Sequence, residues 1–198
     1  MKFTSDIDID FADRDQALAL VKHVPAAIRT GADVRRHNTG VYVTEIPTDP
    51  VLNIAALDYR EAEDRGYIKL DMLNVWLYKH VKNEQHLQEL LQEPIWYKLK
   101  DREFFEQLIH LRNHYETLRS MPESVDSIPR LAMFLSVIRP GKRHLIGRPW
   151  AEVAKTIWQK PDDGSYYFKQ SHAIAYAHLV VLHMNLLEQD PTLLSLPE

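Results

Sequence analysis

An alternating segment at the start of the chain restricts its fold more than any other feature. Residues 3–11 read FTSDIDIDF, in which acidic and apolar side chains alternate strictly from position 6 onward. A period of two predicts a β-strand with one buried face. The apolar side chains at 7, 9 and 11 then face the core, and Asp6, Asp8 and Asp10 face the opposite side.

Three carboxylates on one face of a strand repel one another. Alternate residues lie about 7 Å apart along a strand, and like charges at that spacing destabilise it. Divalent cations remove that cost, and pairs of magnesium ions held by carboxylates catalyse phosphoryl transfer. The alternative is a solvated strand face. A calcium-binding loop is disfavoured because Phe11 stands where glycine is needed and Ala17 where glutamate is needed.

A second acidic position lies in another apolar segment, residues 67–73, which read YIKLDML. Lys69 and Asp71 share one face of this expected strand. A charged pair on a core strand is costly unless it binds something. If this strand lies beside the first, Asp71 completes a three-carboxylate metal site with Asp8 and Asp10, and Lys69 is within reach of a phosphate. The alternative is a simple Lys69–Asp71 ion pair at the end of a sheet.

The remaining patterns predict strands early in the chain and helices later. Further strands are expected over 40–46 and 51–59. Helices are expected over 13–30 with a kink or break at Pro25, and over 75–92, 101–118, 127–138, 149–158 and 171–188. Strands followed by helices indicate an α+β fold. We expect a catalytic sheet region (1–74), a helical insertion (75–138) and a basic segment with a core helix (139–198), together forming one compact domain.

Composition excludes several classes of protein. The 198 residues are 45% hydrophobic, enough for a sizeable core, and the net charge of −4 excludes a generally basic coat. No cysteine is present, which excludes disulfide scaffolds, thiolate zinc sites and cysteine nucleophiles. The near-apolar stretch 173–187 is too short and too polar to span a membrane, and the first residues show no apolar signal region. A cytoplasmic protein without a membrane partner is expected.

A basic stretch covers residues 139–172, with seven Lys and Arg against three Asp and Glu. A local net charge of +4 in an acidic chain suits a polyanionic partner, although a solvated face is the common alternative. The last helix opens with Lys169, Ser171 and His172, and a helix N-terminus favours phosphate. His110 and His114 match no zinc motif and are expected at the surface. Trp96, Trp150 and Trp158 are expected to pack rather than to stack on bases.

Several segments together resemble one family, the alpha subunit of bacterial DNA polymerase III (the C-family DNA polymerases). The strand at 6–11 followed by Arg14 and Asp15 looks like its palm strand, and GYIKLDML at 66–73 is similar to the strand with its third aspartate. The other similar segments are RHNTGV at 36–41, RPG at 139–141 and FKQSHAIAYA at 168–177.

The resemblance implies a polymerase-beta-like nucleotidyltransferase palm sheet with a helical lobe. Asp8, Asp10 and Asp71 would bind two Mg²⁺ ions, for which Mn²⁺ can substitute. A primer 3′-hydroxyl would attack the α-phosphate of a dNTP, releasing pyrophosphate. The side chains implied to face nucleotide or DNA phosphates are Lys69, Arg139, Lys142, Arg143, Lys169, Ser171 and His172.

The family's PHP domain, its Gly-Ser turn, most of its fingers and its clamp-binding tail have no counterpart here. We therefore expect a miniature palm, with DNA primer-template and dNTP as partners and a second protein supplying the missing triphosphate-binding half. Two alternatives are a non-catalytic DNA- or nucleotide-binding accessory of replication and a nucleotidyltransferase with a small substrate. The setting is the cytoplasm, or the host cytoplasm if the gene is viral.

Overall fold

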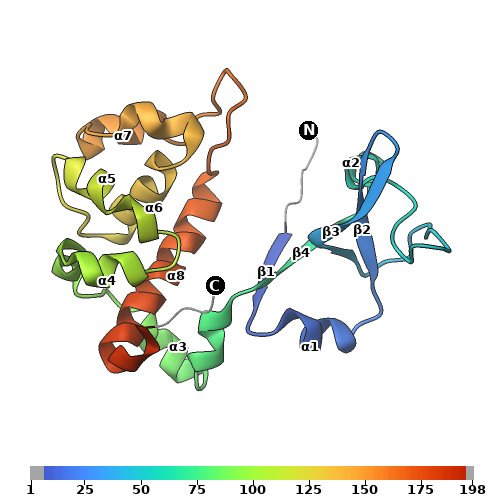
Figure 1. Cartoon of the computed structure of the whole chain (residues 1–198), viewed down its shortest axis with the longest axis horizontal. Helices are drawn as coiled ribbons and strands as arrows, with labels where there is room; N and C mark the ends of the chain where they lie inside the picture. Colours follow the sequence, from blue (N-terminus) through green and yellow to red (C-terminus); the bar gives the residue numbers. More distant parts are fainter. Residues whose placement is uncertain (1–6, 195–198) are drawn as a thin grey trace. The chain divides into compact units, whose positions relative to one another are not determined.

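A computed structural model describes residues 7–194, and its backbone divides into two compact units (Figure 1). The N-terminal unit is Met1–Val81 and the C-terminal unit is Lys82–Glu198. The first contains a β-sheet and the second is helical, so the α+β class is confirmed. The division differs from the expected one, because the segments 82–138 and 139–194 share a single core. Among residues 7–194, no helix is long and apolar enough to cross a membrane.

A small mixed sheet organises the N-terminal unit. Its strands run in the order β1-β4-β3-β2, with β1 and β4 parallel and the other neighbours antiparallel. Because parallel neighbours need a crossover connection, the β2–β3 hairpin and α2 fall between β1 and β4 in the chain. The elements are β1 (Ile7–Phe11), α1 (Arg14–Ala19), β2 (Val24–Thr30), β3 (Asp33–Tyr42), α2 (Tyr59–Asp64), β4 (Leu70–Asn74) and the 3-10 helix η1 (Trp76–His80).

The two helices of this unit cover opposite faces of the sheet (Figure 1). On the α1 face, Leu18 packs against Val41 and Met72. On the α2 face, Ala62 packs in a second cluster with Tyr42. Side chains alternate along each strand, so the neighbours of these core residues point to the face opposite their own.

The helix expected over 13–30 is wrong in its second half. Asp13 caps α1 as expected, accepting hydrogen bonds from the amides of Asp15 and Gln16. The helix ends after one and a half turns, and Val24–Thr30 forms β2, paired with β3. Gly31, at φ +62°, supplies the left-handed residue of the connecting turn. Pairing with β3, rather than any local pattern, makes this proline-containing segment a strand.

The strand expected over 51–59 is also wrong, and that over 40–46 is displaced, because β3 begins at Asp33. Strand β3 ends at Tyr42, and residues 51–59 contribute only isolated bridges. The side chain of Asp49 accepts hydrogen bonds from the amides of Val51 and Leu52, which folds the chain into a turn. Asn53, at φ 54°, continues this turn.

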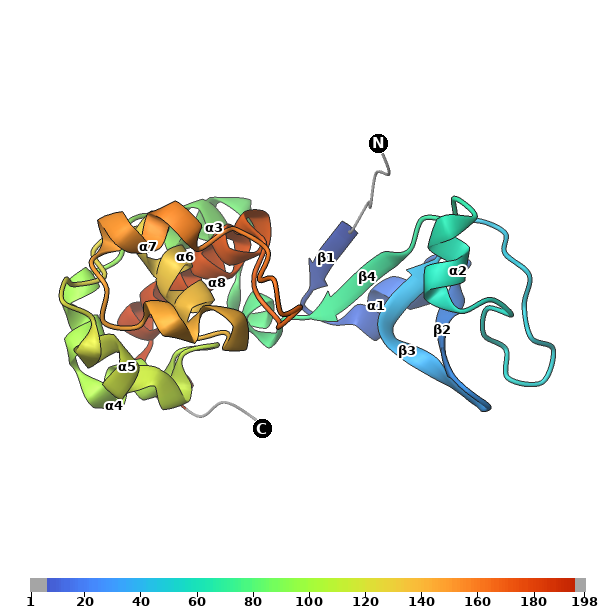
Figure 2. The ribbon, with the colours of Figure 1, turned by 90° about the horizontal axis from the view of Figure 1, so that it is seen from above.

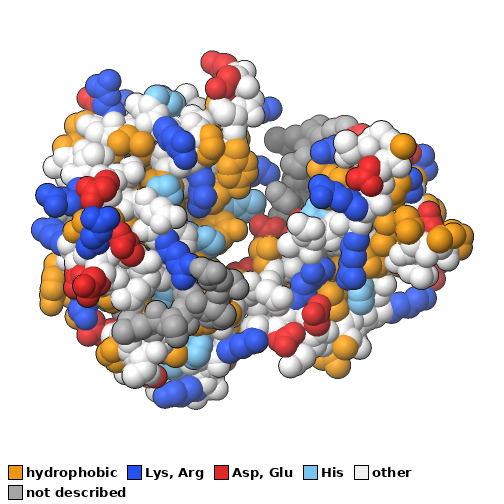
Figure 3. Space-filling model, in the orientation of Figure 1, with side chains coloured by type: hydrophobic (Ala, Val, Ile, Leu, Met, Phe, Trp, Pro, Cys, Tyr) orange, Lys and Arg blue, Asp and Glu red, His pale blue; other side chains and the backbone are white. Residues whose placement is uncertain are grey.

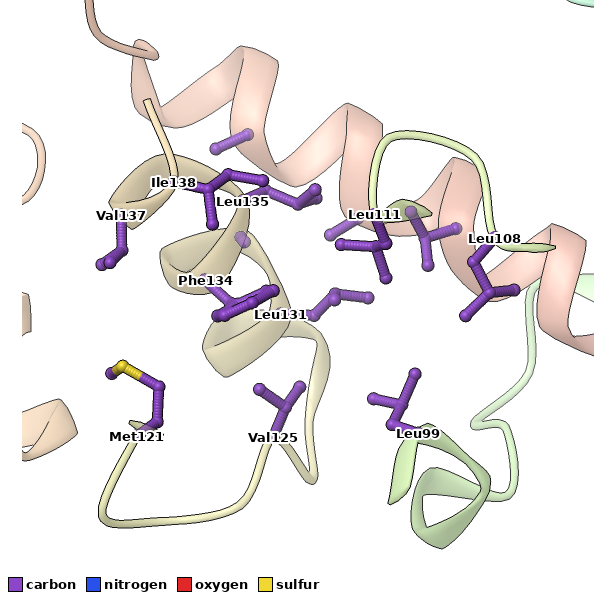
Figure 4. Close-up of a cluster of buried hydrophobic side chains, with 14 of the residues drawn as sticks. Leu99, Leu108, Leu111, Met121, Val125, Leu131, Phe134, Leu135, Val137 and Ile138 are labelled. Carbon is purple, nitrogen blue, oxygen red and sulfur yellow. The ribbon is translucent and has the colours of Figure 1, made fainter. Parts of the chain in front are cut away.

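A single hydrophobic core holds the C-terminal unit together. Helices α6 and α8 pack against each other, and Leu131, Phe134 and Leu135 of α6 are fully buried (Figures 2 and 4). The remaining helices surround this pair. The elements are α3 (Glu84–Leu90), η2 (Trp96–Lys100), α4 (Arg102–Gln107), η3 (Arg112–His114), α5 (Tyr115–Ser120), α6 (Ile128–Val137), η4 (Pro140–Leu145), α7 (Trp150–Thr156), α8 (Gln170–Gln189) and η5 (Pro191–Leu194).

The helices expected over 127–138, 149–158 and 171–188 are confirmed as α6, α7 and α8. The helix expected over 101–118 begins at its predicted cap, Asp101, but breaks after α4. His110 adopts φ 65°, a left-handed conformation that no α-helix continues, between the fully buried Leu108 and Leu111. The helix expected over 75–92 is likewise divided, into η1 and α3.

Candidate functional site

The two acidic strands of the N-terminal unit lie side by side. Asp8 of β1 and Asp71 of β4 are register partners in the parallel pair, and Asp10 is partner to Leu73. Strands in a sheet are about 4.8 Å apart, and register partners point to the same face. The expected adjacency of the two strands is therefore present, with Asp8, Asp10 and Asp71 on one face. Asp6 lies outside the described residues.

Asp71 is buried, with 8% of its surface exposed, and both carboxylate oxygens have partners. The Thr39 hydroxyl donates to Oδ1 at 2.6 Å, and the Lys69 ammonium donates to Oδ2. Nδ1 of His37 lies 3.8 Å from Oδ1. Lys69 and Asp71 thus form an ion pair, which is the alternative to a metal site, and Thr39 fixes the orientation of the carboxylate.

Lys69 lies across the neighbouring strand to reach this carboxylate. Its ammonium is 5.9 Å from the centre of the Tyr59 ring, within the range of a cation–π contact. Its stem crosses Gly40, the register partner of Asp71 on β3. A Cβ atom at position 40 would lie 2.7 Å from Cδ of Lys69. The glycine therefore provides the space in which the lysine side chain lies.

The bend at residues 37–40 brings the partners of Asp71 into place. Nδ1 of His37 accepts hydrogen bonds from the amides of Thr39 (3.2 Å) and Gly40 (2.9 Å), which requires this nitrogen to be unprotonated. Burial, and then the charge of Lys69, lower the pKa of His37, consistent with a neutral ring. Arg14 donates to the carbonyls of Asn38 (2.7 Å) and Thr39 (3.3 Å) and holds the bend from α1.

Asp10 lies in a different environment from Asp71. Partial desolvation, followed by the charge of Asp8, raises the pKa of Asp10, and a hydrogen bond with Tyr78 opposes that rise. Burial and the nearby Asp10 charge raise the pKa of Tyr78. A proton or a cation near Asp8 and Asp10 would relieve the repulsion between them.

The donor chemistry of this face fits a hard divalent cation, because carboxylate oxygens are the ligands that Mg²⁺ and Mn²⁺ prefer. Metal binding by all three carboxylates requires one side chain to move. Both oxygens of Asp71 are engaged by Thr39 and Lys69, so Asp71 gains a free oxygen only when the lysine moves away. Across residues 7–194, no group of three or more His, Asp or Glu side chains is already arranged around a common metal position.

The other predicted phosphate-binding residues belong to the C-terminal unit. The guanidinium of Arg139 lies 4.0 Å from the centre of the Phe168 ring, and Phe168 stacks on Tyr176 with centroids 5.2 Å apart. His110, expected at the surface, packs edge-on against Tyr176 at 4.4 Å. Burial lowers the pKa of Arg139. The structure thus places Arg139 in an aromatic cluster.

Lys142 is used inside the fold. It is 4% exposed and donates to the carbonyl of Thr156 at 2.6 Å. The preceding Gly141 donates its amide to the carbonyl of Tyr166 at 2.9 Å, and a Cβ there would lie 2.8 Å from Cγ of Pro161. These contacts attach the segment that contains Arg139 to the loop before α8, which is a structural role for Lys142.

The remaining predicted residues are more accessible. Arg143 is exposed, as are Lys169 at the N-cap of α8 and Ser171 in its first turn, and His172 is half-buried. Figure 3 shows basic and acidic side chains interspersed on the face of the C-terminal unit that it presents. These side chains can bind a phosphate without unfolding any helix.

Sequence reasoning missed three contributors to the carboxylate face. Thr39 holds Asp71, Tyr59 contacts Lys69 and His37, and Tyr78 bonds Asp10. The only local signal was the RHNTGV segment, which resembles the polymerase family but contains no recognisable catalytic pattern.

A scan against protein-family models, a search of curated proteins and a search of solved structures each found no match for this chain.

Proposed function

We propose that the N-terminal unit is a miniature nucleotidyltransferase palm, similar to that of the DNA polymerase III alpha subunit, which transfers a nucleotide from a dNTP. One observation carries the proposal. Asp8 and Asp71 are register partners on parallel strands, and Asp10 shares their face. Register partners lie about 4.8 Å apart and alternate residues of a strand about 7 Å apart, so the three carboxylates are near enough to share the two metal ions of phosphoryl transfer.

Side chains of the N-terminal unit would have three roles: metal binding, orientation of a metal ligand and phosphate binding. Asp8, Asp10 and Asp71 would hold two Mg²⁺ ions, which when bound would polarise the attacking hydroxyl and stabilise the leaving pyrophosphate. Thr39 keeps Asp71 oriented through its hydrogen bond. Lys69 would leave Asp71 for a phosphate oxygen of the nucleotide, so that one carboxylate oxygen becomes free as the negative charge of the substrate arrives.

In the C-terminal unit, the exposed Arg143 and Lys169 would bind DNA phosphates, with Ser171 and His172 in the first turn of α8, and Arg139 would hold this segment through its contact with Phe168. Lys142 would support this segment from within, given its bond to Thr156. A partner chain would supply the remainder of the triphosphate site.

Primer extension tests the proposal. Wild-type protein with primer-template, dNTPs and Mg²⁺ or Mn²⁺ should extend the primer, alone or with its partner, and Asp8→Asn and Asp71→Asn should each reduce the rate at least about 100-fold. Glu45→Gln is the matched control, because Glu45 is exposed on the same unit and lines a different pocket, with Lys22 and His23. Extension unchanged in either aspartate variant would refute the catalytic assignment. Pyrophosphate released without DNA would instead indicate a small substrate.

A second candidate is a non-catalytic accessory that binds DNA or nucleotides. The observation in its favour is that Asp71 already has a partner at each oxygen, Thr39 and Lys69. On this alternative, DNA affinity falls steeply with salt and survives Asp8→Asn, while no extension occurs under any condition. DNA binding that does not depend on salt would argue against it.

A further inference from the structure

The C-terminal unit contains a cleft that the proposed function does not use. It has a volume of about 550 Å³ and lies between η2, α5 and the segment 121–126. Ligand pockets for small molecules typically have volumes of about 300–1,000 Å³. No motif in this part of the sequence indicated a site.

The walls of the cleft are aromatic. Trp96, Tyr97 and Tyr115 line it, and Tyr97 is 69% exposed. The polar atoms of two of these rings already have partners, because Trp96 Nε1 donates to Glu93 at 2.5 Å and the Tyr115 hydroxyl donates to the Lys100 carbonyl at 2.5 Å. Trp96 and Tyr97 therefore offer apolar surface to an occupant, as stacking platforms for bases do. The Tyr115 ring already contacts the Arg102 guanidinium and the edge of Phe105, and it closes one side of the cleft.

The floor of the cleft is the edge of the hydrophobic core. Leu99, Met121 and Val125 line the cleft and also belong to the core cluster, with at most 7% of their surface exposed. Figure 4 shows the three side chains on one side of the core, with Met121 and Val125 below α6. A floor packed in this way is formed before any ligand arrives.

Two cations without acidic partners lie at the cleft. Lys100 and Arg119 are exposed lining residues, and no acidic side chain within residues 7–194 pairs with either of them. Arg119 follows Tyr115 by four positions and so shares its helix face, and Tyr115 is bonded to Lys100. Lys100 and Arg119 therefore both line the cleft next to Tyr115.

The two acids that line the cleft share a single cationic partner. Glu123 and Asp126 pair with Arg130 at 3.6 and 2.9 Å, and Glu123 also accepts the Trp150 amide at 2.8 Å. With Lys100, Arg119 and Arg130 against Glu123 and Asp126, the charge left at the cleft is positive.

We propose that this cleft binds a small planar anion with the chemistry of a nucleoside monophosphate. The base would lie against Trp96 and Tyr97, above the apolar floor. The phosphate dianion would meet Lys100 and Arg119, and two cations suit its two charges. This site is separate from the carboxylate face and does not depend on the function proposed for that face.

Calorimetric titration of the full chain with AMP in EDTA tests the proposal. We expect binding that Lys100→Gln/Arg119→Gln weakens about tenfold and Tyr97→Ala about fivefold. The matched control is Arg148→Gln/Lys155→Gln, which removes two exposed cations elsewhere on the unit and should change the affinity less than about twofold. Amide NMR shifts on adding AMP should concentrate in residues 96–126.

Other ligands and one further variant separate the alternatives. Adenosine binding as tightly as AMP would overturn the role of the cations, and inorganic phosphate binding as tightly would overturn the role of the rings. Benzoate binding more tightly than AMP would overturn the phosphate assignment.

Loss of AMP binding in the Asp71→Asn variant would place the nucleotide at the carboxylate face. Absence of AMP binding to the wild-type protein would refute the site outright. Because EDTA is present, each result stands apart from metal-dependent transfer.

Discussion

Gly40 and Lys69 are complementary: a Cβ atom on residue 40 would lie 2.7 Å from Cδ of the lysine. The lysine, one residue before β4, crosses β3 at the only residue type that leaves room for its stem, and its ammonium then reaches Asp71 in β4. The absence of a side chain at position 40 therefore determines where the charge of Lys69 lies.

Gly40→Ala should displace Lys69 and destabilise the protein by about 1–3 kcal/mol, the usual cost of crowding a packed site. Urea unfolding measures the loss. A double-mutant cycle supplies the control, because most of the penalty should disappear when Lys69→Ala has already removed the stem. A penalty of the same size in both backgrounds would show that the lysine is not what the new methyl group meets.

Asp8→Asn and Asp71→Asn should differ in stability even if both abolish activity. Asp71→Asn leaves the mostly buried Lys69 ammonium without its carboxylate, at a cost of about 3 kcal/mol. Asp8→Asn removes a charge that repels Asp10 on an edge strand and should change stability by less than about 0.5 kcal/mol or raise it. Urea unfolding at pH 7 measures both. Equal destabilisation by the two variants would contradict this account.

His110 should make the protein less stable in mild acid. Burial, and then the charge of Arg139, lower the pKa of His110 to about 4, against 6.5 for an unperturbed histidine. The unfolded chain therefore binds the proton first as the pH falls. The stability contributed by the neutral ring is complete above pH 6.5 and is lost as the pH falls toward 4.

His110→Asn tests this, since asparagine tolerates the left-handed backbone at φ 65° and does not titrate in this range. Its unfolding free energy should fall less between pH 7 and pH 5 than that of the wild type. The exposed His144→Asn is the control and should retain the wild-type slope. An unaltered slope in His110→Asn would mean that other groups cause the acid sensitivity.

Lys142→Met should destabilise the fold because the buried ammonium is the donor to the Thr156 carbonyl. That carbonyl keeps the Gln159 amide at 3.1 Å, so loss of the lysine donor should cost about 1 kcal/mol, which thermal or urea unfolding will detect. Arg143→Met, at the exposed neighbouring position, should leave stability within about 0.5 kcal/mol of wild type. If Lys142→Met were as stable as wild type, the contact with Thr156 would not be its main role.

Local patterns in the sequence predicted those helices and strands that form because of interactions between residues close together in the sequence. Alternation identified β1, but the buried face expected at 7, 9 and 11 is wrong in part, because Ile7 is 39% exposed and Ile9 and Phe11 are only half-buried. The Asp13 and Asp101 side chains marked two helix starts, and long apolar stretches marked α6 and α8. Each is a property of residues within a few positions of one another, because strand alternation, capping and helical burial all act at short range.

The elements that depend on distant partners were decided by the tertiary structure. Val24–Thr30 is a strand because β3 pairs with it, and the pattern around Pro25 and two alanines shows no period of its own. Thr39 reaches Asp71 across 32 positions of sequence, and the aromatic cleft needs residues 96–126 folded together. A short-range pattern records which side of an element is buried. It does not record what the element is buried against, and that choice is made when the whole chain packs.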